Sequence, residues 1–287
     1  MTRTPNRAPR VLLTGAVGRV GTALRPLLLR AWGALRLTDR VTPTALATGE
    51  TFVPAELADL DAVRRAVEGI DAVVHLGGCP TEAPWSTLLE SNLVGAYHLF
   101  EAAREAGVAR VVFASTNHVA GFYPRETTIP PEVTVRPDSR YGASKAFGEA
   151  LGALYADKHG LRVLCVRIGN VGARPIDRRR LAIWIHPEDL AQLVRLGVEH
   201  PALRYEVVWG ASDNARGWWD NRRAHALGYA PRHRSEDHAA AVLARPEPAD
   251  PVADRFQGGS FCALEFDHDP TLAGPQATEA QTPPRVR

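Results

Sequence analysis

The sequence predicts an α/β fold in which a parallel sheet is covered by helices on both of its faces. Short apolar segments alternate with longer segments of helical periodicity through the first 170 residues. The apolar segments are continuous rather than interrupted by polar residues, which indicates strands that are buried on both faces. This order of elements is typical of a doubly wound sheet. The expected strands are residues 10–14, 35–39, 71–76, 110–115 and 161–168.

The helices between these strands are indicated by the spacing of their apolar residues and by the glycines that end them. The pattern at residues 90–106 is long and amphipathic and stops at Gly107, and the pattern at residues 141–159 is closed by Gly160. Glycine is common at the ends of helices because it adopts the left-handed conformation there. The expected helices are residues 21–32, 59–68, 90–106 and 141–159.

The chain is 287 residues long, which suits one large α/β domain with a small appendage. After Gly169 the regular alternation stops, and the remaining patterns are a helix at about 187–199, a strand at 205–209 and a helix near 218–227. We therefore predict a small cap rather than a second full domain. The final segment is rich in Pro, Ala, Thr and Asp and has little periodicity, which is typical of disorder. The predicted division is a flexible N-terminus at 1–9, a core at 10–170, a small C-terminal substrate cap at 171–262 and a disordered tail at 263–287.

The composition excludes several classes of function. The 34 Lys and Arg residues are balanced by 32 Asp and Glu residues, so no electrostatic footprint for nucleic acid stands out. No apolar stretch approaches the roughly 18–20 residues of a membrane span, and no apolar signal core follows the basic residues 1–10. Cys79, Cys165 and Cys262 lack metal or redox spacing, and no His/Cys cluster suggests a metal. We expect a soluble, cytoplasmic protein whose partners include no metal, nucleic acid or membrane.

Gly15, Gly18 and Gly21 follow the first expected strand and open the first expected helix. This is the context of a dinucleotide-binding turn, in which the backbone approaches the pyrophosphate and the helix N-terminus faces anionic oxygen. Asp39 ends the second strand, where a carboxylate can accept hydrogen bonds from the adenosine ribose and repel a 2′-phosphate. Arg40 beside it can neutralise such a phosphate, and a glycine-rich turn without a ligand is the alternative. We predict a dinucleotide-binding core of the Rossmann type.

Tyr141 and Lys145 lie four residues apart on an expected helix, so their side chains share one helix face. A cation at Lys145 favours the phenolate form of Tyr141 and so lowers its pKa. A tyrosine that can hold or release a proton beside a nicotinamide is the minimum equipment for oxidising an alcohol. The pair therefore predicts a dehydrogenase.

These motifs occur together with Leu76-Gly77-Gly78, Asn92 and Ser115-Thr116. The distinctive stretches are His75-Leu-Gly-Gly78, Phe113-Ala-Ser-Thr-Asn-His118, Gly121-Phe-Tyr-Pro124, Val166-Arg-Ile-Gly169, Val208-Trp-Gly-Ala211, Gly217-Trp-Trp-Asp-Asn221 and Arg255-Phe-Gln-Gly-Gly259. Together they resemble an extended short-chain dehydrogenase/reductase, and within that superfamily the bacterial uronate dehydrogenases most closely. The resemblance covers residues from about 10 to 262, and its last three stretches point to the subfamily.

By this resemblance Tyr141 is the catalytic acid/base, and Lys145 binds the nicotinamide ribose and lowers the tyrosine pKa. Thr116 matches the hydroxyl residue that orients the substrate alcohol, with Ser115 as the alternative. The implied cofactor is NAD, and its implied contacts, besides Tyr141 and Lys145, are Gly15, Val17, Gly18, Arg19, Val20, Gly21, Asp39, Glu56, Leu57, Leu76, Gly77, Gly78 and Asn92. The implied contacts of the sugar acid are Thr116, Asn117, His118, Tyr141, Asn170 and Arg179.

The reaction implied by the resemblance is the removal of a hydride from C1 of a pyranose uronic acid, galacturonate or glucuronate. It gives an aldarolactone and NADH. Three positions depart from the family pattern: Pro80 and Asn170 stand where serines are usual, and Glu56 stands where an aspartate is usual. Proline has no hydrogen to donate, and an amide is larger than a hydroxyl, so these changes bear on the substrate rather than on the chemistry.

Two other functions remain open from the sequence. The first is a nucleotide-sugar epimerase, dehydratase or reductase on the same scaffold, a class that generally carries a larger C-terminal lobe. The second is a sensor that binds NAD(P) without turnover, which would have no need of Tyr141 and Lys145. His118 can instead be a structural residue, and residues 178–180 can be a solvated basic turn. The sequence also leaves open association of the chain with further copies of itself.

Overall fold

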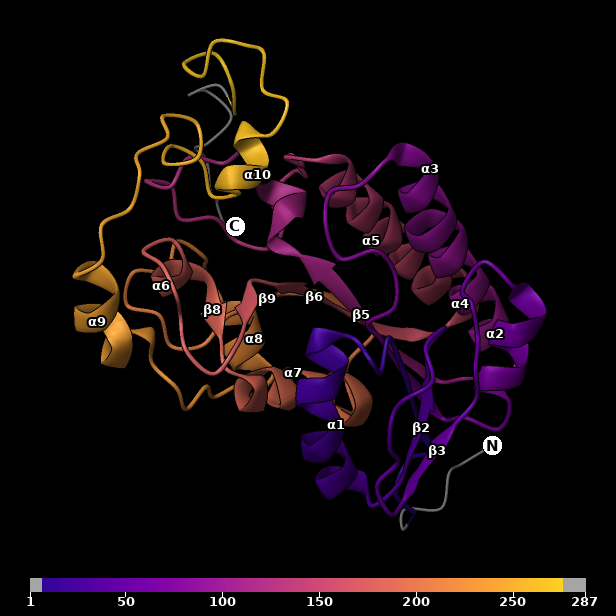
Figure 1. Ribbon diagram of the computed structural model, residues 1–287. Coiled ribbons are helices and arrows are strands. Elements are labelled where there is room, and N and C mark those ends of the chain that lie inside the picture. The colour runs from indigo at the N-terminus through magenta and orange to yellow at the C-terminus, as the bar shows by residue number, and fades with distance from the viewer. Residues whose placement is uncertain (1–6, 276–287) are drawn as a thin grey trace, which may run out of the picture.

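The computed structural model describes residues 7–275, and its centre is a sheet in which every strand is parallel to its neighbours (Figure 1). Within the described residues this sheet has seven strands in the order β3-β2-β1-β4-β5-β6-β9. The fold is therefore the doubly wound α/β type that the sequence predicts. The strands are β1 (Val11–Thr14), β2 (Leu35–Thr38), β3 (Glu50–Phe52), β4 (Ala72–His75), β5 (Arg110–Thr116), β6 (Arg162–Ile168) and β9 (Tyr205–Gly210).

Helices cover both faces of the sheet, and a separate hydrophobic core lies under each layer. On one face, α1 (Arg19–Trp32) and α7 (Pro187–Glu199) bury leucines such as Leu24 and Leu190 against the strands. The other face is covered by α2 (Leu60–Val67), α4 (Gly95–Glu105) and α5 (Arg140–His159). Because both faces are covered, the strands are continuous apolar runs. Shorter elements are α3 (Trp85–Leu88), α6 (Arg180–Ile183), α8 (Arg222–Ala226), α9 (Ala239–Leu243), α10 (Ser260–Ala263), the π-helix η1 (Leu89–Val94), the 3₁₀ helices η2 (Asn117–Ala120) and η3 (Ser235–His238), and the strand pair β7 (Asn170–Val171) and β8 (Trp184–Ile185).

The second half of the chain contributes to the sheet layer as well as to the region above it. Both β9 and α7 fall in the range assigned to the cap, but β9 pairs with β6 and α7 packs on the sheet. The boundary at residue 170 thus does not separate the sheet from the rest of the chain. The division into core, cap and tail is otherwise still a prediction. The tail prediction lies partly outside the described residues, and residues 264–275 contain turns but neither helix nor strand.

Two local predictions differ from the structure. The strand β3 has no apolar run to reveal it, because it is three residues long and only Glu50 in it is buried. The helix expected near 218–227 is confined to α8, since residues 218–220 pair instead with Ile129 through backbone hydrogen bonds on both sides of that residue. Pairing between segments that are distant in the sequence cannot be recognised from local periodicity.

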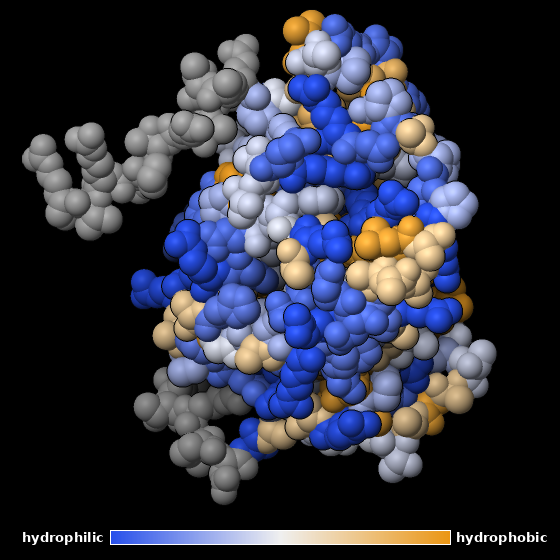
Figure 2. Space-filling view, turned by 90° about the vertical axis from the view of Figure 1, so that its left-hand side faces the viewer, coloured by the Kyte–Doolittle hydropathy of each residue, from blue (hydrophilic) through white to orange (hydrophobic). Residues whose placement is uncertain are grey.

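The strand order places the candidate site. It reverses between β1 and β4, and ligands of open α/β sheets bind outside the carboxyl ends of the strands at such a point. The C-terminal segment with α10, yellow in Figure 1, lies beside the residues that follow β5. No helix of the described part of the chain is long and apolar enough to cross a membrane. The face of the molecule in Figure 2 is mainly hydrophilic, with apolar residues in small groups.

The packing of α5 on the sheet depends on glycine at position 148. A Cβ atom there would lie 2.1 Å from Cζ of Phe113 in β5, whereas a Cβ at Gly152, one turn later, would lie 3.1 Å from Val163 Cγ1. We expect Gly148→Ala to lower the free energy of unfolding by about 1–3 kcal/mol, because overpacking displaces the ring or the helix. Urea unfolding would measure it. Gly152→Ala is the comparison variant and should cost clearly less, because its neighbours need to move by only a few tenths of an ångström, so equal losses in both variants would contradict this account.

Candidate active site

The turn between β1 and α1 is shaped by glycines and leaves a helix N-terminus uncapped. Gly15 has φ of 64°, and a Cβ atom there would lie 2.8 Å from the backbone of Leu76. A Cβ at Gly21 would lie 2.2 Å from the carbonyl oxygen of Gly15. Gly18 is the N-cap of α1 and offers no side-chain hydrogen bond to the first turn. The backbone can thus approach a ligand closely, and the N–H groups of the first turn suit an anionic group such as a pyrophosphate.

Asp39 lies beyond the end of β2 and is tied to the glycine-rich turn. Its Oδ2 accepts a hydrogen bond from the amide of Val17 at 3.0 Å, and its Oδ1 accepts one from the amide of Val41 at 3.2 Å. The carboxylate therefore both shapes the turn and stands at the edge where an adenosine ribose would lie in this fold. Arg40 is exposed beside it.

The other predicted cofactor contacts line the same end of the sheet. Leu57 packs against Gly77, where a Cβ atom would lie 2.8 Å from Leu57 Cδ1, and the carboxylate of Glu56 accepts from the amide of Leu57. The guanidinium of Arg19 donates to the carbonyl of Val171 in β7, which joins the turn to the second half of the chain. Predicted contacts Val20 and Leu76 pack against the core under α1 and α7.

Asn92, in the π-helix η1, holds the loop after β4. Its Oδ1 accepts from the amide of Cys79 at 2.7 Å, and its Nδ2 donates to Ser144 Oγ in α5 at 2.9 Å. Gly78 has φ of 122°, and a Cβ atom there would lie 2.6 Å from Asn92 Oδ1. The amide therefore fixes the wall of the site that joins η1, this loop and α5. Extra residues in a helix of the π type often mark functional positions.

Tyr141 and Lys145 occupy the first two turns of α5, and both side chains are buried. The phenol of Tyr141 lies close enough to the hydroxyl of Thr116, at the end of β5, for that hydroxyl to lower its pKa. The ammonium of Lys145 lies 5.1 Å above the ring of Phe113. The end of β5 and the start of α5 thus bring the three predicted catalytic residues to one place.

The electrostatics of this pair differ from the expectation that Lys145 lowers the tyrosine pKa. Burial raises the pKa of Tyr141 to about 12, and the nearby hydroxyl of Thr116 offsets only part of that effect. Burial also lowers the pKa of Lys145 to about 8. Loss of hydration disfavours the charged form of each group and is the largest cause of both shifts.

The structure distinguishes the two hydroxyls at the end of β5. Ser115 Oγ donates to Glu149 Oε1 at 2.5 Å, and Glu149 also receives two hydrogen bonds from the guanidinium of Arg167, at 2.9 and 2.8 Å. The Ser115 hydroxyl is thus committed to a buried carboxylate on the sheet side of α5. Thr116 is the hydroxyl at Tyr141.

The side chains of Asn117 and Arg179 contact each other next to the carbonyls of Ile168 and Gln257. In the amide orientation that satisfies both of its groups, Asn117 accepts from Arg179 Nη2 at 2.9 Å and donates to the carbonyl of Ile168 at 3.3 Å. Arg179 Nε donates to the carbonyl of Gln257 at 2.8 Å. Burial lowers the pKa of Arg179 to about 10, so the guanidinium stays positive at neutral pH. Asn170 follows closely in β7 and is partly buried, whereas Pro80 is exposed in the loop after Gly78.

His118 is buried between two elements that the sequence did not connect. Its Nδ1 lies 2.7 Å from Asp138 Oδ2, and its ring stacks on that of Phe261 with centroids 3.9 Å apart. Neither Asp138 nor Phe261 was among the predicted site residues. Asp138 lies three positions before Tyr141, and this proximity in the sequence is the one weak indication that it belongs to the site. Phe261 reaches the site across more than 100 residues of chain, so no local signal exists for it.

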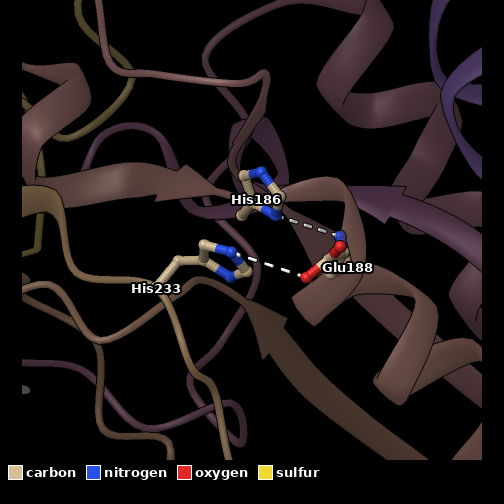
Figure 3. Close-up of side chains that lie close together, drawn as sticks. All are labelled: His186, Glu188 and His233. Carbon is tan, nitrogen blue, oxygen red and sulfur yellow. Dashed lines mark hydrogen bonds and ion pairs between the residues drawn. The ribbon is translucent and has the colours of Figure 1, made fainter.

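A second cluster of polar side chains lies away from Tyr141, at the start of α7 (Figure 3). Among the described residues, His186, Glu188 and His233 form the one group of three whose metal-ligand atoms all lie within 4.8 Å of one another. The two imidazole rings are stacked, with centroids 3.5 Å apart and planes 22° apart. Their in-plane lone pairs therefore run nearly parallel instead of converging. One of them, on His186 Nδ1, already accepts from the amide of Glu188 at 3.3 Å, and we assign no ion to this cluster.

The sequence and the fold both have known relatives. The profile of the NAD dependent epimerase/dehydratase family matches residues 11–219. A uronate dehydrogenase from Pseudomonas putida is 44% identical over 264 residues, which are 91% of this chain and 97% of that one. An NAD-dependent glucose-6-phosphate dehydrogenase from Haloferax volcanii is 37% identical and covers 84% of this chain and 98% of its own. The crystal structure of a uronate dehydrogenase variant from Agrobacterium tumefaciens, complexed with NAD, has a TM-score of 0.86 at 40% identity and covers 89% of this chain and 97% of that one.

These likenesses extend over nearly the whole described chain and include the glycine-rich turn, β5 and α5. The chain therefore belongs to the NAD dependent epimerase/dehydratase family and, within it, to the uronate dehydrogenases.

Proposed function

We propose that this protein oxidises a uronic acid, galacturonate or glucuronate, at C1 to the aldarolactone, with NAD as the hydride acceptor. The observation that carries the proposal is the meeting of Tyr141, Thr116 and Lys145 where β5 ends and α5 begins. NAD-dependent oxidation of a CH–OH group agrees with the family, and the uronate follows from relatives that are 41–44% identical.

The residues of the first half fit a dinucleotide. The turn at Gly15 to Gly21 presents backbone N–H groups without a side-chain cap, and Asp39 stands where a ribose hydroxyl would be bound. NAD, when bound there, takes the hydride that leaves C1. We assign the pyrophosphate to the N-terminus of α1 and the nicotinamide ribose to Lys145 and Tyr141.

The chain's own residues handle the proton and the orientation of the sugar. In this assignment Thr116 donates to the reacting oxygen and Tyr141 accepts the proton of the C1 hydroxyl, because the two hydroxyls lie close together at the end of β5 and the start of α5. The raised pKa of Tyr141 means that the base form is scarce at neutral pH. We assign to Lys145, held on the same face of α5, the stabilisation of that form in the complex. Asn117, His118, Asn170 and Arg179 face the sugar acid in this proposal.

The alternatives fit less well. A nucleotide-sugar enzyme needs room for a diphosphate and a second nucleoside, but Arg179 is covered by the carbonyl of Gln257 and by Asn117. A sensor without turnover would not need Tyr141 and Thr116 in contact. A sugar 6-phosphate carries a phosphate where a uronate carries a carboxylate. Because the relative from Haloferax volcanii is a glucose-6-phosphate dehydrogenase, glucose 6-phosphate should be tested beside the uronates. Three free cysteines in the described chain agree with a reducing, cytoplasmic location, which we also propose.

Tyr141→Phe should lower kcat for NADH formation by at least about 10²–10⁴, since general acid–base catalysis is typically worth that factor. Absorbance at 340 nm measures turnover, and fluorescence titration should give nearly the same Kd for NAD. Tyr155→Phe is the matched control, because it makes the same change on the same helix, where the hydroxyl donates to Glu101. Retention of most of the turnover in Tyr141→Phe would refute the mechanism.

The unmodified protein should have a higher kcat/KM with NAD than with NADP, because a 2′-phosphate would face the carboxylate of Asp39. Asp39→Ala should narrow the gap, partly by favouring NADP beside Arg40 and partly by releasing the turn at Val17. Adding Arg40→Ala should remove the NADP gain. Equal kcat/KM for both cofactors in the unmodified protein would mean that Arg40 governs the pocket.

Arg179→Ala should raise KM for galacturonate or glucuronate by a factor equivalent to about 2–4 kcal/mol, the cost of truncating a buried charge pair. Arg179→Lys should recover only part of it, because an ammonium lacks the planar fork. Arg178→Ala is the control, since this neighbour is exposed. Galactose and glucose should be affected little. Equal losses on charged and neutral sugars would leave Arg179 a merely structural role, and preference for glucose 6-phosphate over both uronates would reject the proposed substrate.

A further inference from the structure

Asp138 is a carboxylate sealed inside the protein next to the candidate active site. Its side chain is fully buried, and its Oδ2 lies 2.7 Å from Nδ1 of His118. The other oxygen, Oδ1, accepts from Ser139 Oγ at 2.7 Å, and the backbone amide of Asp138 donates to the carbonyl of His118 at 3.2 Å. Asp138 is not among the residues assigned above to cofactor or substrate binding.

Two glycines from distant parts of the chain make room for this carboxylate. A Cβ atom at Gly121 or at Gly258 would lie 1.9 Å from Asp138 Oδ2 in either case. The amide of Gly258 donates to the carbonyl of Gly121 at 2.9 Å, so the two backbones meet over the carboxylate. A third neighbour, Cys262 Sγ, lies 4.0 Å away. The site is therefore built around a carboxylate held at this one position.

The carboxylate determines which nitrogen of His118 carries a proton. A carboxylate accepts hydrogen bonds, so Nδ1 carries the hydrogen and, in the neutral ring, Nε2 has a free lone pair. The ring cannot turn readily, because it is stacked on Phe261 at 3.9 Å and meets the edge of Tyr141 at 6.0 Å. The amide of His118 also donates to Thr116 Oγ1 at 3.3 Å.

We propose that Asp138 is a positioning residue that holds His118 as the Nδ1–H tautomer, so that Nε2 accepts a hydrogen bond from a sugar hydroxyl other than the one oxidised. The reacting hydroxyl is excluded because Tyr141 and Thr116 already serve it. This inference rests on the proposed function, since it deepens the recognition of the sugar at the same site. It makes the pair a determinant of which hydroxylated substrates bind.

A second role for the same carboxylate would give a different result. Asp138 also attracts the guanidinium of Arg179, which burial would otherwise disfavour. If this attraction were its main role, loss of Asp138 would weaken recognition of the C6 carboxylate and leave the hydroxyls unaffected. The two roles therefore differ in the part of the substrate that loses its contact.

The tautomer can be read without any substrate. Long-range ¹H–¹⁵N NMR of the protein labelled at histidine nitrogen gives the protonated nitrogen of each ring, and His118→Gln assigns the His118 signals. We expect the Nδ1–H form in the unmodified protein and loss of that preference in Asp138→Ala, with Asp138→Asn between them because an amide oxygen is a weaker acceptor. An Nε2–H ring in the unmodified protein would overturn the proposal.

The kinetic test uses uronates and their monodeoxy analogues at saturating NAD. Asp138→Ala should lower kcat/KM for the uronate by about 10- to 100-fold, the range for a polar group left unpaired, mainly through KM, and Asp138→Asn should recover part. One monodeoxy analogue lacks the hydroxyl that would bind Nε2 of His118. With this analogue, the variants and the unmodified protein should have nearly equal kcat/KM. Should Asp138→Ala not fold, Asp138→Asn carries the same comparison.

Two further variants separate a direct role from a structural one. Asp189→Asn is the matched control, because Asp189 is also fully buried and lies 3.3 Å from a histidine nitrogen, that of His233, outside the site. It should leave KM and kcat nearly unchanged. Asp138→Asn should add little to the loss in His118→Gln. Equal losses on every analogue, or full additivity with His118→Gln, would overturn the proposal. A protein that oxidises no uronate would reject the proposed function, whereas the NMR result would stand.

Discussion

The ion pair between Glu149 and Arg167 holds together the elements on which the candidate site depends. Glu149 lies on α5, the helix of Tyr141, and receives hydrogen bonds from Arg167 in β6 and from Ser115 in β5. Arg167 also donates to the carbonyl of Pro131 and lies over the ring of Trp209 in β9. The buried carboxylate of Glu149 thus connects α5 directly to β5 and β6, and Arg167 extends this connection to β9. Removing either partner of such a pair typically costs about 3–5 kcal/mol, because the other charge is left buried and unpaired.

The same burial that fixes this geometry creates the chemistry of the site. Tyr141 and Lys145 have lost most of their hydration, so their pKa values move apart, that of Tyr141 up to about 12 and that of Lys145 down to about 8. Water would restore both values and would also compete for the proton of the alcohol. A dry site makes each later contact count more, because charges interact more strongly where the dielectric is low. The phenolate of Tyr141 is therefore a strong base but a scarce one at neutral pH, so the precise placement of the phenol matters.

From the sequence we predicted candidate-site residues that lie in local motifs, and nothing in it pointed to those brought in by distant segments. Gly15 to Gly21 and the Tyr141–Lys145 pair are each contained within one turn and one helix, where periodicity and spacing are visible. The fold class followed from continuous apolar strands for the same reason. Asp138 and Phe261 depend on contacts between distant segments, and β9 could be assigned to the sheet only once its pairing with β6 was seen. The direction of the tyrosine pKa was also missed, because burial cannot be read from the spacing of two residues.

The two halves of the site are consequently built by different physical means. On the proposed assignment, the cofactor half is formed by β1, β2 and the turn between β1 and α1, whose shape depends mainly on contacts within the first half of the chain. The half proposed to face the sugar is completed by residues 255–262, where the side-chain amide of Gln257 donates to the carbonyls of Pro124 and Thr127 and its backbone carbonyl accepts from Arg179. Gly258 and Phe261 from this segment enclose Asp138 and His118. On the proposed assignment, substitutions in this short segment can therefore alter recognition of the sugar while the glycine-rich turn stays intact.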